Sequence, residues 1–234
     1  MASSSEEFTY KSYRLDPKSP NFQFLAGKYA AISLQALSTD PGSFGVAYST
    51  ESTLGASEYA IRLSRPNIDV FICVAHAASL ASELHDIEHG HWIGMVTQVG
   101  PTPKEVFWLR DSGAPEPLDD ELETKWHHTG LWVDPAHRRK GISSQLIKAA
   151  LEHAAKTLTG TVQQTRFRLF AAPGNEGSPG LYGSLGFTHV GKCTIPEAMA
   201  GNGNATYPFR GIEKWSEEEL QRREGVILEK VIVK

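Results

Sequence analysis

The sequence is poor in cysteine, has no long apolar run and carries no excess of positive charge. The two cysteines, Cys73 and Cys193, provide neither a disulfide framework nor metal-type spacing, which fits a reducing compartment. No apolar run approaches the roughly 20 residues of a membrane-spanning helix, and "MASSSEEF" lacks the cationic and apolar parts of a secretory signal. The formal net charge of -4 gives no general attraction to nucleic acid or anionic membranes. We therefore expect a soluble cytoplasmic protein, with the nucleus as an open alternative, that binds neither nucleic acid nor membrane.

What the sequence does contain is an alternation of strand-like and helix-like segments. With 40% hydrophobic and 21% charged residues, the chain can form an ordinary globular core. The apolar spacing and turn residues predict these strands: 8–15, 69–77, 91–99, 126–133, 165–172 and 226–234, with 104–110 as a possible extension. The same criteria predict these helices: 21–37, 52–66, 141–158, 180–187 and a polar one from Ser216.

This order of segments predicts an α/β (α+β) fold with a mixed sheet covered by helices on both faces. No linker divides the chain, so we expect one domain over residues 1–234, with residues 1–7 flexible. Residues 111–123 form a proline-rich acidic loop insertion, and residues 194–223 form a second insertion of loop and helix.

A cationic cluster stands where a predicted strand gives way to the clearest predicted helix. In "VDPAHRRKGISSQL", Arg138, Arg139 and Lys140 precede Gly141, and the helix begins at once. A helix amino terminus exposes unpaired N–H groups and the positive end of the dipole, and glycine lets a bulky anion approach the backbone. The segment therefore indicates a phosphate site or, alternatively, a solvated basic turn. It has neither the G-x-x-x-x-G-K-[ST] nor the G-x-G-x-x-G pattern.

Three segments resemble the GNAT superfamily of acyl-CoA-dependent N-acyltransferases. "LWVDPAHRRKGIS" resembles its pyrophosphate-binding segment, with Arg138 and Gly141 on the first two fixed positions of [Arg/Gln]-x-x-Gly-x-[Gly/Ala] and Ser143 departing from the third. "NEGSPGLYGSLGF" resembles the family segment Asn-x-x-Ala-x-x-Leu-Tyr-x-x-x-Gly-Phe, with Ser178 in place of alanine. "LQALSTDPGSFG" resembles the end of the family's first helix. Together these segments extend the resemblance to about residue 190.

The resemblance implies a mostly antiparallel GNAT-like sheet and direct transfer of an acetyl group from acetyl-CoA to an amine, without a metal. It implies that Val133 pairs with pantetheine, that Leu131 lies close to the acetyl carbonyl, and that Tyr182 protonates the departing thiolate. The residues that it implies for binding acetyl-CoA are Leu131, Trp132, Val133, Arg138, Arg139, Lys140, Gly141, Ile142, Ser143, Ser144, Asn175 and Tyr182.

His127 occupies the position at which the family often has a glutamate that accepts the proton of the attacking amine. A histidine near its usual pKa of about 6.5 suits that role. Strand alternation would place His127, Thr129, Leu131 and Val133 on one face and His128 on the other. The alternatives are that His127 is an ordinary strand residue and that Tyr182 is a core aromatic.

The acceptor is expected to enter beside the first two helices, the loop near residues 100–125 and the segment from Tyr207 to Trp215. Phe44, Tyr48, Trp108 and Trp215 are candidate walls, although core packing explains aromatic residues equally well. The acidic loop could attract a cationic amine or could simply be a solvated surface. We expect a small-molecule amine as substrate and a monomer or homodimer as the assembly.

Two other functions remain open at this point. "HDIEHGH" has His85, Glu88 and His89 in the order found in inverted zinc peptidases, but Gly90 and the following strand favour a hairpin. A non-catalytic acyl-CoA-binding or regulatory module of the same fold is favoured by Ser143 and Pro179, whereas Tyr182 favours an enzyme.

Overall fold

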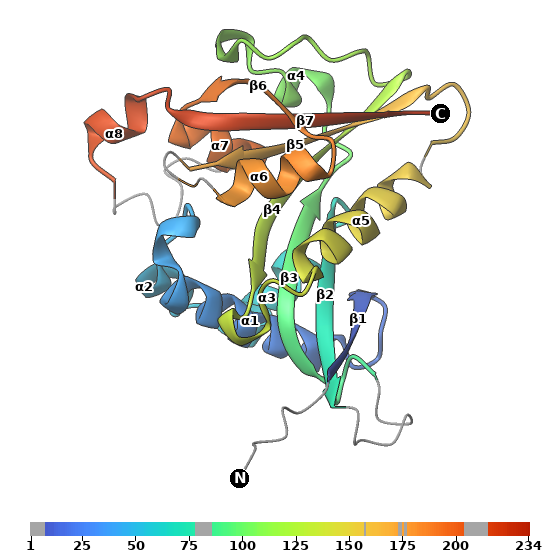
Figure 1. Ribbon diagram of the computed structural model, residues 1–234, viewed down its shortest axis with the longest axis vertical. Helices are drawn as coiled ribbons and strands as arrows, with labels where there is room; N and C mark the ends of the chain where they lie inside the picture. The colour runs from blue at the N-terminus through green and yellow to red at the C-terminus, as the bar shows by residue number, and fades with distance from the viewer. Residues whose placement is uncertain (1–7, 78–85, 157, 173–174, 176, 204–214) are drawn as a thin grey trace.

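The computed structural model describes residues 8–77, 86–156, 158–172, 175, 177–203 and 215–234, and its centre is a seven-stranded sheet (Figure 1). The strand order is β1-β2-β3-β4-β5-β7-β6. β4 and β5 are parallel, and every other neighbouring pair is antiparallel. The strands are β1 (Phe8–Arg14), β2 (Ile68–Ala77), β3 (His91–Val99), β4 (Glu123–Val133), β5 (Gln164–Ala171), β6 (Thr188–Cys193) and β7 (Gly225–Val233). The mixed, mostly antiparallel sheet is therefore confirmed.

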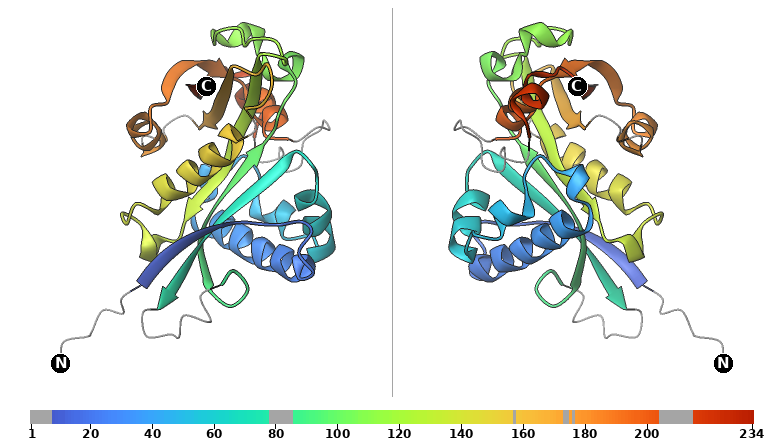
Figure 2. Two further views of the ribbon diagram at one scale, coloured as in Figure 1. Left: turned by 90° about the vertical axis from the view of Figure 1, so that its right-hand side faces the viewer. Right: turned by 90° about the vertical axis from the view of Figure 1, so that its left-hand side faces the viewer.

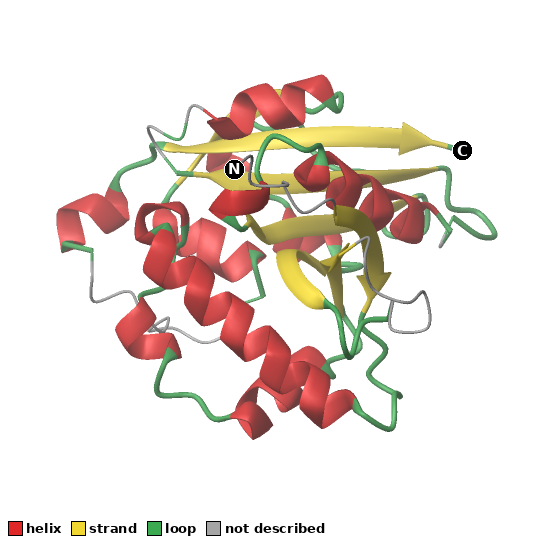
Figure 3. Cartoon of the chain, turned by 60° about the horizontal axis from the view of Figure 1, so that its bottom comes forward, coloured by secondary structure: helices red, strands yellow, loops and turns green. Residues whose placement is uncertain are grey.

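Helices cover both faces of the sheet, as predicted (Figures 2 and 3). On one face α1 (Phe22–Thr39) and α3 (Ala56–Leu63) pack on β2 and β3, and the short α2 (Tyr48–Glu51) lies between them in sequence. On the other face α5 (Ile142–Ala155) packs on the same strands. The alternation of β2 explains both cores, because Val70 and Ile72 belong to the α1 core while Phe71 and Cys73 belong to the α5 core.

The parallel strands β4 and β5 separate towards their carboxyl ends. Their pairing runs from Glu123↔Gln164 to His128↔Leu169, yet β4 continues to Val133 and β5 to Ala171. β4 stays paired with β3, whereas β5 stays paired with β7, and Figure 1 shows β5 and β7 crossing the direction of β4. The sheet therefore opens as a wedge between the ends of two adjacent strands.

A β-bulge changes the direction of the side chains in β4. Thr97 pairs with Thr129 and Met95 with Trp132, so two residues of β4, Gly130 and Leu131, oppose the single Val96 of β3. Gly130 has φ of +64°, a left-handed conformation that glycine adopts without a Cβ penalty.

The bulge overturns the predicted sharing of one face by His127, Thr129, Leu131 and Val133. An extra residue reverses the alternation beyond it. Trp132 therefore packs in the α1 core, on the same face of the sheet as Thr129. Val133 packs in the α5 core, on the opposite face. His128 lies on the α5 side too, against Phe167.

Several elements differ from those that the sequence patterns predicted. β6 and α7 (Ile195–Gly201) were not expected, and residues 104–107 form α4 (Lys104–Phe107) instead of a strand. The short helix at α6 (Gly177–Ser184) and the polar helix α8 (Glu217–Gln221), which Ser216 caps, are confirmed.

Several carboxylates of the acidic loop are paired within the described chain. The Lys104 ammonium lies 2.9 Å from Asp119 and 2.8 Å from Glu116, and the buried Lys125 ammonium lies 2.7 Å from Asp120. These carboxylates do not line the cavity described below. Of the two hypotheses for the acidic loop, a solvated surface loop agrees with this structure better than a role in attracting a cationic amine. None of the described helices combines the length and apolar character needed to span a bilayer.

Candidate active site

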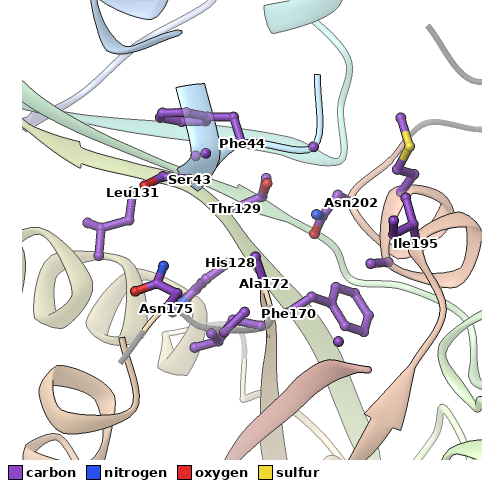
Figure 4. Close-up of a pocket in the computed structure, with 18 of the residues that line it drawn as sticks. Ser43, Phe44, His128, Thr129, Leu131, Phe170, Ala172, Asn175, Ile195 and Asn202 are labelled. Atoms are coloured by element: carbon purple, nitrogen blue, oxygen red, sulfur yellow. The ribbon is translucent and has the colours of Figure 1, made fainter. Parts of the chain in front are cut away.

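A cavity of about 610 Å³ occupies the wedge between β4 and β5. Its walls come from residues 128–133 of β4, residues 169–172, the turn around η1 (Pro41–Ser43), α6 and α7. Figure 4 shows Leu131 and Asn175 at one side of this cavity and Ile195 and Asn202 at the other. The cavity therefore has two ends, one beside the start of α5 and one beneath α7.

A second hollow of about 190 Å³ adjoins the first at the amino terminus of α5. We call residues 138–144 the cradle. Arg139 and Gly141 both have positive φ, of +63° and +78°, a conformation found in backbone concavities that bind anions through their N–H groups. The first-turn N–H groups of α5 have no partner within the helix, and the helix dipole adds positive potential. The cradle is therefore suited to a phosphate group.

The side chains of the cradle take different directions. The Arg138 Nε donates to the Val133 carbonyl at 2.9 Å, and its guanidinium is paired with Asp40. Asp40 also accepts a hydrogen bond of 2.7 Å from the Trp132 indole. The Lys140 ammonium donates to the Tyr10 hydroxyl at 3.0 Å. Arg138 thus lies where the two hollows meet, whereas the ammonium of Lys140 is directed at β1.

The other residues expected to bind acetyl-CoA lie along the same path. Leu131, Trp132, Val133 and Asn175 line the large cavity, Ser143 lines both hollows, and Ser144 lines the small one. Ile142 also lines the small hollow, but it is buried in the α5 core.

Tyr182 lies on α6 and lines the large cavity next to Leu181. The ring is buried and packs edge-on against Phe187, with 5.2 Å between the ring centroids. Burial raises the pKa of the Tyr182 phenol above its usual value, so the hydroxyl keeps its proton at neutral pH. A protonated hydroxyl in this position can act as a proton donor.

His127 is placed beside the cavity but not in its lining. The ring is 1% exposed, stacks on Phe170 at 5.5 Å between centroids, lies 4.8 Å from the Phe107 ring, and touches Gly201 of α7. Neither ring nitrogen has a hydrogen-bond partner in the described structure. Burial, followed by the positive charge of Arg168, lowers the pKa of His127 well below its usual value. A role as proton acceptor for this neutral ring stays a prediction.

His128, which the sequence analysis did not select, does line the cavity. Its Nε2 lies 3.1 Å from the Gln98 side-chain nitrogen, and burial lowers the pKa of His128 from about 6.5 to about 4. The unfolded chain therefore binds more protons than the folded chain between these two values, so stability falls as the pH falls through this window.

This shift predicts that acidification from pH 7 to pH 4 removes about 3 kcal/mol of unfolding free energy through His128 alone. The variant His128→Gln should lose correspondingly less over the same range, because glutamine does not titrate. Urea unfolding at a series of pH values measures both curves. If the unfolding free energy of the wild type and of His128→Gln fell equally with pH, a lowered pKa of His128 would be contradicted.

The four expected acceptor walls divide into two pairs. Phe44 and Trp215 line the cavity. Tyr48 is exposed and Trp108 lies 3.8 Å below the Arg110 guanidinium, and neither lines it. Tyr207 lies outside the described residues. The lining residues that the sequence analysis did not select include Phe170, Ile195, Met199 and Asn202.

The zinc-peptidase pattern does not form a site in the described structure. Residues 86–90 form a turn in which the Asp86 carboxylate accepts the Glu88 and His89 N–H groups. Asp86 also contacts the His89 ring at 2.9 Å. No group of three potential metal ligands occurs among the described residues, and His85 lies outside them. The turn agrees with the predicted hairpin connection.

Comparisons with known proteins agree with this geometry. Residues 104–189 match the family model described as an acetyltransferase (GNAT) domain. No sequence match was found among curated proteins. The fold is similar to that of NAA60 from Arabidopsis thaliana in complex with a bisubstrate analogue, with 14% identity, a TM-score of 0.53, and coverage of 96% of this chain and 99% of that one.

Two further structures have the same fold. One is an acetyltransferase of the GNAT family from Streptococcus pneumoniae, with 15% identity, a TM-score of 0.52, and coverage of 96% of this chain and 99% of that one. The other is RimL, a ribosomal L7/L12 alpha-N-protein acetyltransferase in complex with coenzyme A, with 12% identity, a TM-score of 0.51, and coverage of 96% and 94%. Residues 104–189 thus match a GNAT acetyltransferase domain, and the chain as a whole has the fold of these acetyltransferase structures.

Proposed function

We propose that this protein is an acetyltransferase that binds acetyl-CoA in the wedge and transfers the acetyl group directly to a primary amine. The observation that carries the proposal is the continuity of the two hollows, because a helix terminus suited to a phosphate opens into the gap between β4 and β5. NAA60, whose fold is similar, has been solved in complex with acetyl-CoA.

The residues of the site fit the parts of acetyl-CoA from end to end. The backbone N–H groups of the cradle would hold the pyrophosphate, with the Arg138 guanidinium beside it. A Cβ at Gly141 would meet no atom within 4 Å, so the surface there is open to a bulky group. The edge of β4 beyond His128 is free of β5 and can pair with the pantetheine amides, and Leu131 would lie near the acetyl carbonyl.

The chemistry proposed for the wedge is a single displacement. The amine nitrogen forms a bond to the acetyl carbon, the carbon–sulfur bond breaks, and the amine loses a proton to water. Tyr182 donates its hydroxyl proton to the departing sulfur, and water then returns a proton to the phenolate. Tyr182 lines the cavity, which supports an enzyme over a non-catalytic binding module. Ser143 lines both hollows, and its small side chain leaves room for a ligand in the cradle.

We further propose a small-molecule amine over a protein as the acceptor, and a cytoplasmic monomer or homodimer as the working form. Both cysteines are free and buried, which fits a reducing compartment.

Calorimetric titration of the purified protein with acetyl-CoA tests this function, followed by assay of free thiol released in the presence of amines. We expect binding in the micromolar range and amine-dependent thiol release. A well-folded protein that takes up no acetyl-CoA would overturn the proposal.

A further inference from the structure

The end of the cavity beneath α7 is lined mainly by apolar side chains. Met199 of α7 reaches to 3.9 Å from a Cβ position at Gly45, so this helix and the η1 turn close over the cavity from two sides. The apolar wall consists of Phe44, Phe170, Ile195, Ala198, Met199 and Trp215. A group held here must therefore present an apolar surface.

The side chain of Asn202 is a polar group in the described part of this wall. The Oδ1 of Asn202 is buried and accepts no hydrogen bond from the described residues. Figure 4 shows the Asn202 amide directed towards the middle of the cavity. Because a buried acceptor left unpaired is costly, a donor from a bound molecule is the natural partner for this oxygen. Thr194, in contrast, already uses its hydroxyl to cap α7.

Among the described lining residues, carboxylates occur only at the outer boundary of this end. Glu224 is exposed, lines the cavity and forms no ion pair with a described residue. Glu219 lines the cavity from α8, where its carboxylate accepts a hydrogen bond from the Ser216 N–H. The third lining carboxylate, Asp40, is held by Arg138 at the other end. The described wall thus has charged groups at its entrance, including Arg222, which is paired with Glu218, but no interior carboxylate for a second positive charge.

From these features we infer that the acceptor is a singly charged primary amine on an apolar body, whose N–H is received by Asn202 Oδ1. This inference rests on the proposed acetyl transfer and specifies its acceptor. The apolar body fills the space between Phe44, Phe170 and Met199. The amine of a small molecule and the amino terminus of a peptide beginning with a large apolar residue share this chemistry.

The test is a comparison of kcat/KM for 2-phenylethylamine, hexylamine, ethanolamine, spermidine and a tetrapeptide beginning with phenylalanine, at saturating acetyl-CoA. We expect 2-phenylethylamine and hexylamine to exceed ethanolamine and spermidine by about tenfold or more. The tetrapeptide distinguishes the source, since its acetylation at a comparable rate identifies peptide termini as acceptors of this class.

Equal or faster turnover of spermidine or ethanolamine would overturn the inference. So would normal binding of acetyl-CoA with no turnover of any apolar amine, an outcome that leaves the acetyl-CoA site standing. Absence of acetyl-CoA binding would instead remove the proposed function, and the inference with it.

Variants of Asn202 test its role separately. Asn202→Leu, which keeps the size but removes the acceptor oxygen, should raise the KM for 2-phenylethylamine about tenfold and leave the KM for acetyl-CoA unchanged. Asn202→Asp retains an acceptor and should recover most of that loss. Asn67→Leu, at an exposed asparagine outside the cavity, is the matched control. An unchanged amine KM in Asn202→Leu would rule out the contact.

Discussion

Replacing Gly141 with aspartate should weaken acetyl-CoA binding by roughly two to three orders of magnitude. The carboxylate would enter the space in which the cradle is expected to hold the pyrophosphate. Two unit charges of like sign 4 Å apart repel by about 4 kcal/mol at an effective dielectric constant of 20. The left-handed backbone at φ of +78° adds about 1 kcal/mol of strain for any side chain. Isothermal titration calorimetry measures the loss.

Two controls separate charge from strain and from general damage. Gly141→Ala carries the strain without the charge, and a Cβ there meets no atom within 4 Å, so its affinity should fall by less than tenfold. Gly160→Asp places the same charge on a glycine of similar conformation, φ of +59°, with equally open surroundings near the other end of α5. It should bind normally. Unchanged affinity in Gly141→Asp would place the phosphates elsewhere.

Tyr182→Phe should lower kcat by about a hundredfold and leave acetyl-CoA affinity nearly unchanged. The substitution removes only the hydroxyl, so the packing on Phe187 stays in place. Without that proton the sulfur must leave as an unassisted thiolate. Steady-state kinetics with thiol detection, combined with calorimetry, separates the chemical step from binding.

The pH dependence gives a second test of Tyr182. Because burial raises the pKa of this phenol, the donor keeps its proton over the range in which a free phenol begins to ionise. The kcat of the wild type should therefore not decline between about pH 8 and 10 through loss of this proton. Tyr13→Phe, on the edge strand β1 and outside both hollows, is the matched control. A Tyr182→Phe enzyme with full kcat would remove the residue from the mechanism.

The cradle and the main helices could be predicted from sequence because their signals are local. The start of α5 is encoded by the cationic run and Gly141, and its apolar face by residues at helical spacing such as Leu146 and Ala150. Tyr182 was found through the resemblance of its whole segment to a family pattern, and the structure places it on the cavity.

The side-chain directions in β4 could not be predicted from alternation alone. A bulge depends on pairing with another strand, and here Gly130 and Leu131 oppose Val96. The glycine inside an otherwise regular strand was the available signal. If Gly130 had been taken as the site of a bulge, Val133 would have been assigned to the face opposite Thr129. That is the face of His128, which would then have been selected as a candidate.

The wall formed by α7 was missed for another reason. Its sequence, "TIPEAMAG", is short and has little apolar periodicity, so it resembles a loop. Thr194 and Glu197 nevertheless form a capping box, and Pro196 stands near the helix start where proline is favoured. The long-range contact that gives this helix its place, Gly201 against Phe170 and His127, has no local signal at all.

The separation of β4 from β5 also bears on how the fold is held together. The amino-terminal strands β1 to β4 and the carboxy-terminal strands β5 to β7 form two halves. Among the described residues of the sheet, only the pairs from Glu123↔Gln164 to His128↔Leu169 join them. A molecule that forms hydrogen bonds with the unpaired edges of both β4 and β5 adds to the contacts that join the two halves. Binding at a hundred times the dissociation constant adds about 2.7 kcal/mol to the folded state. Occupancy of the wedge therefore couples the unfolding of one half to that of the other.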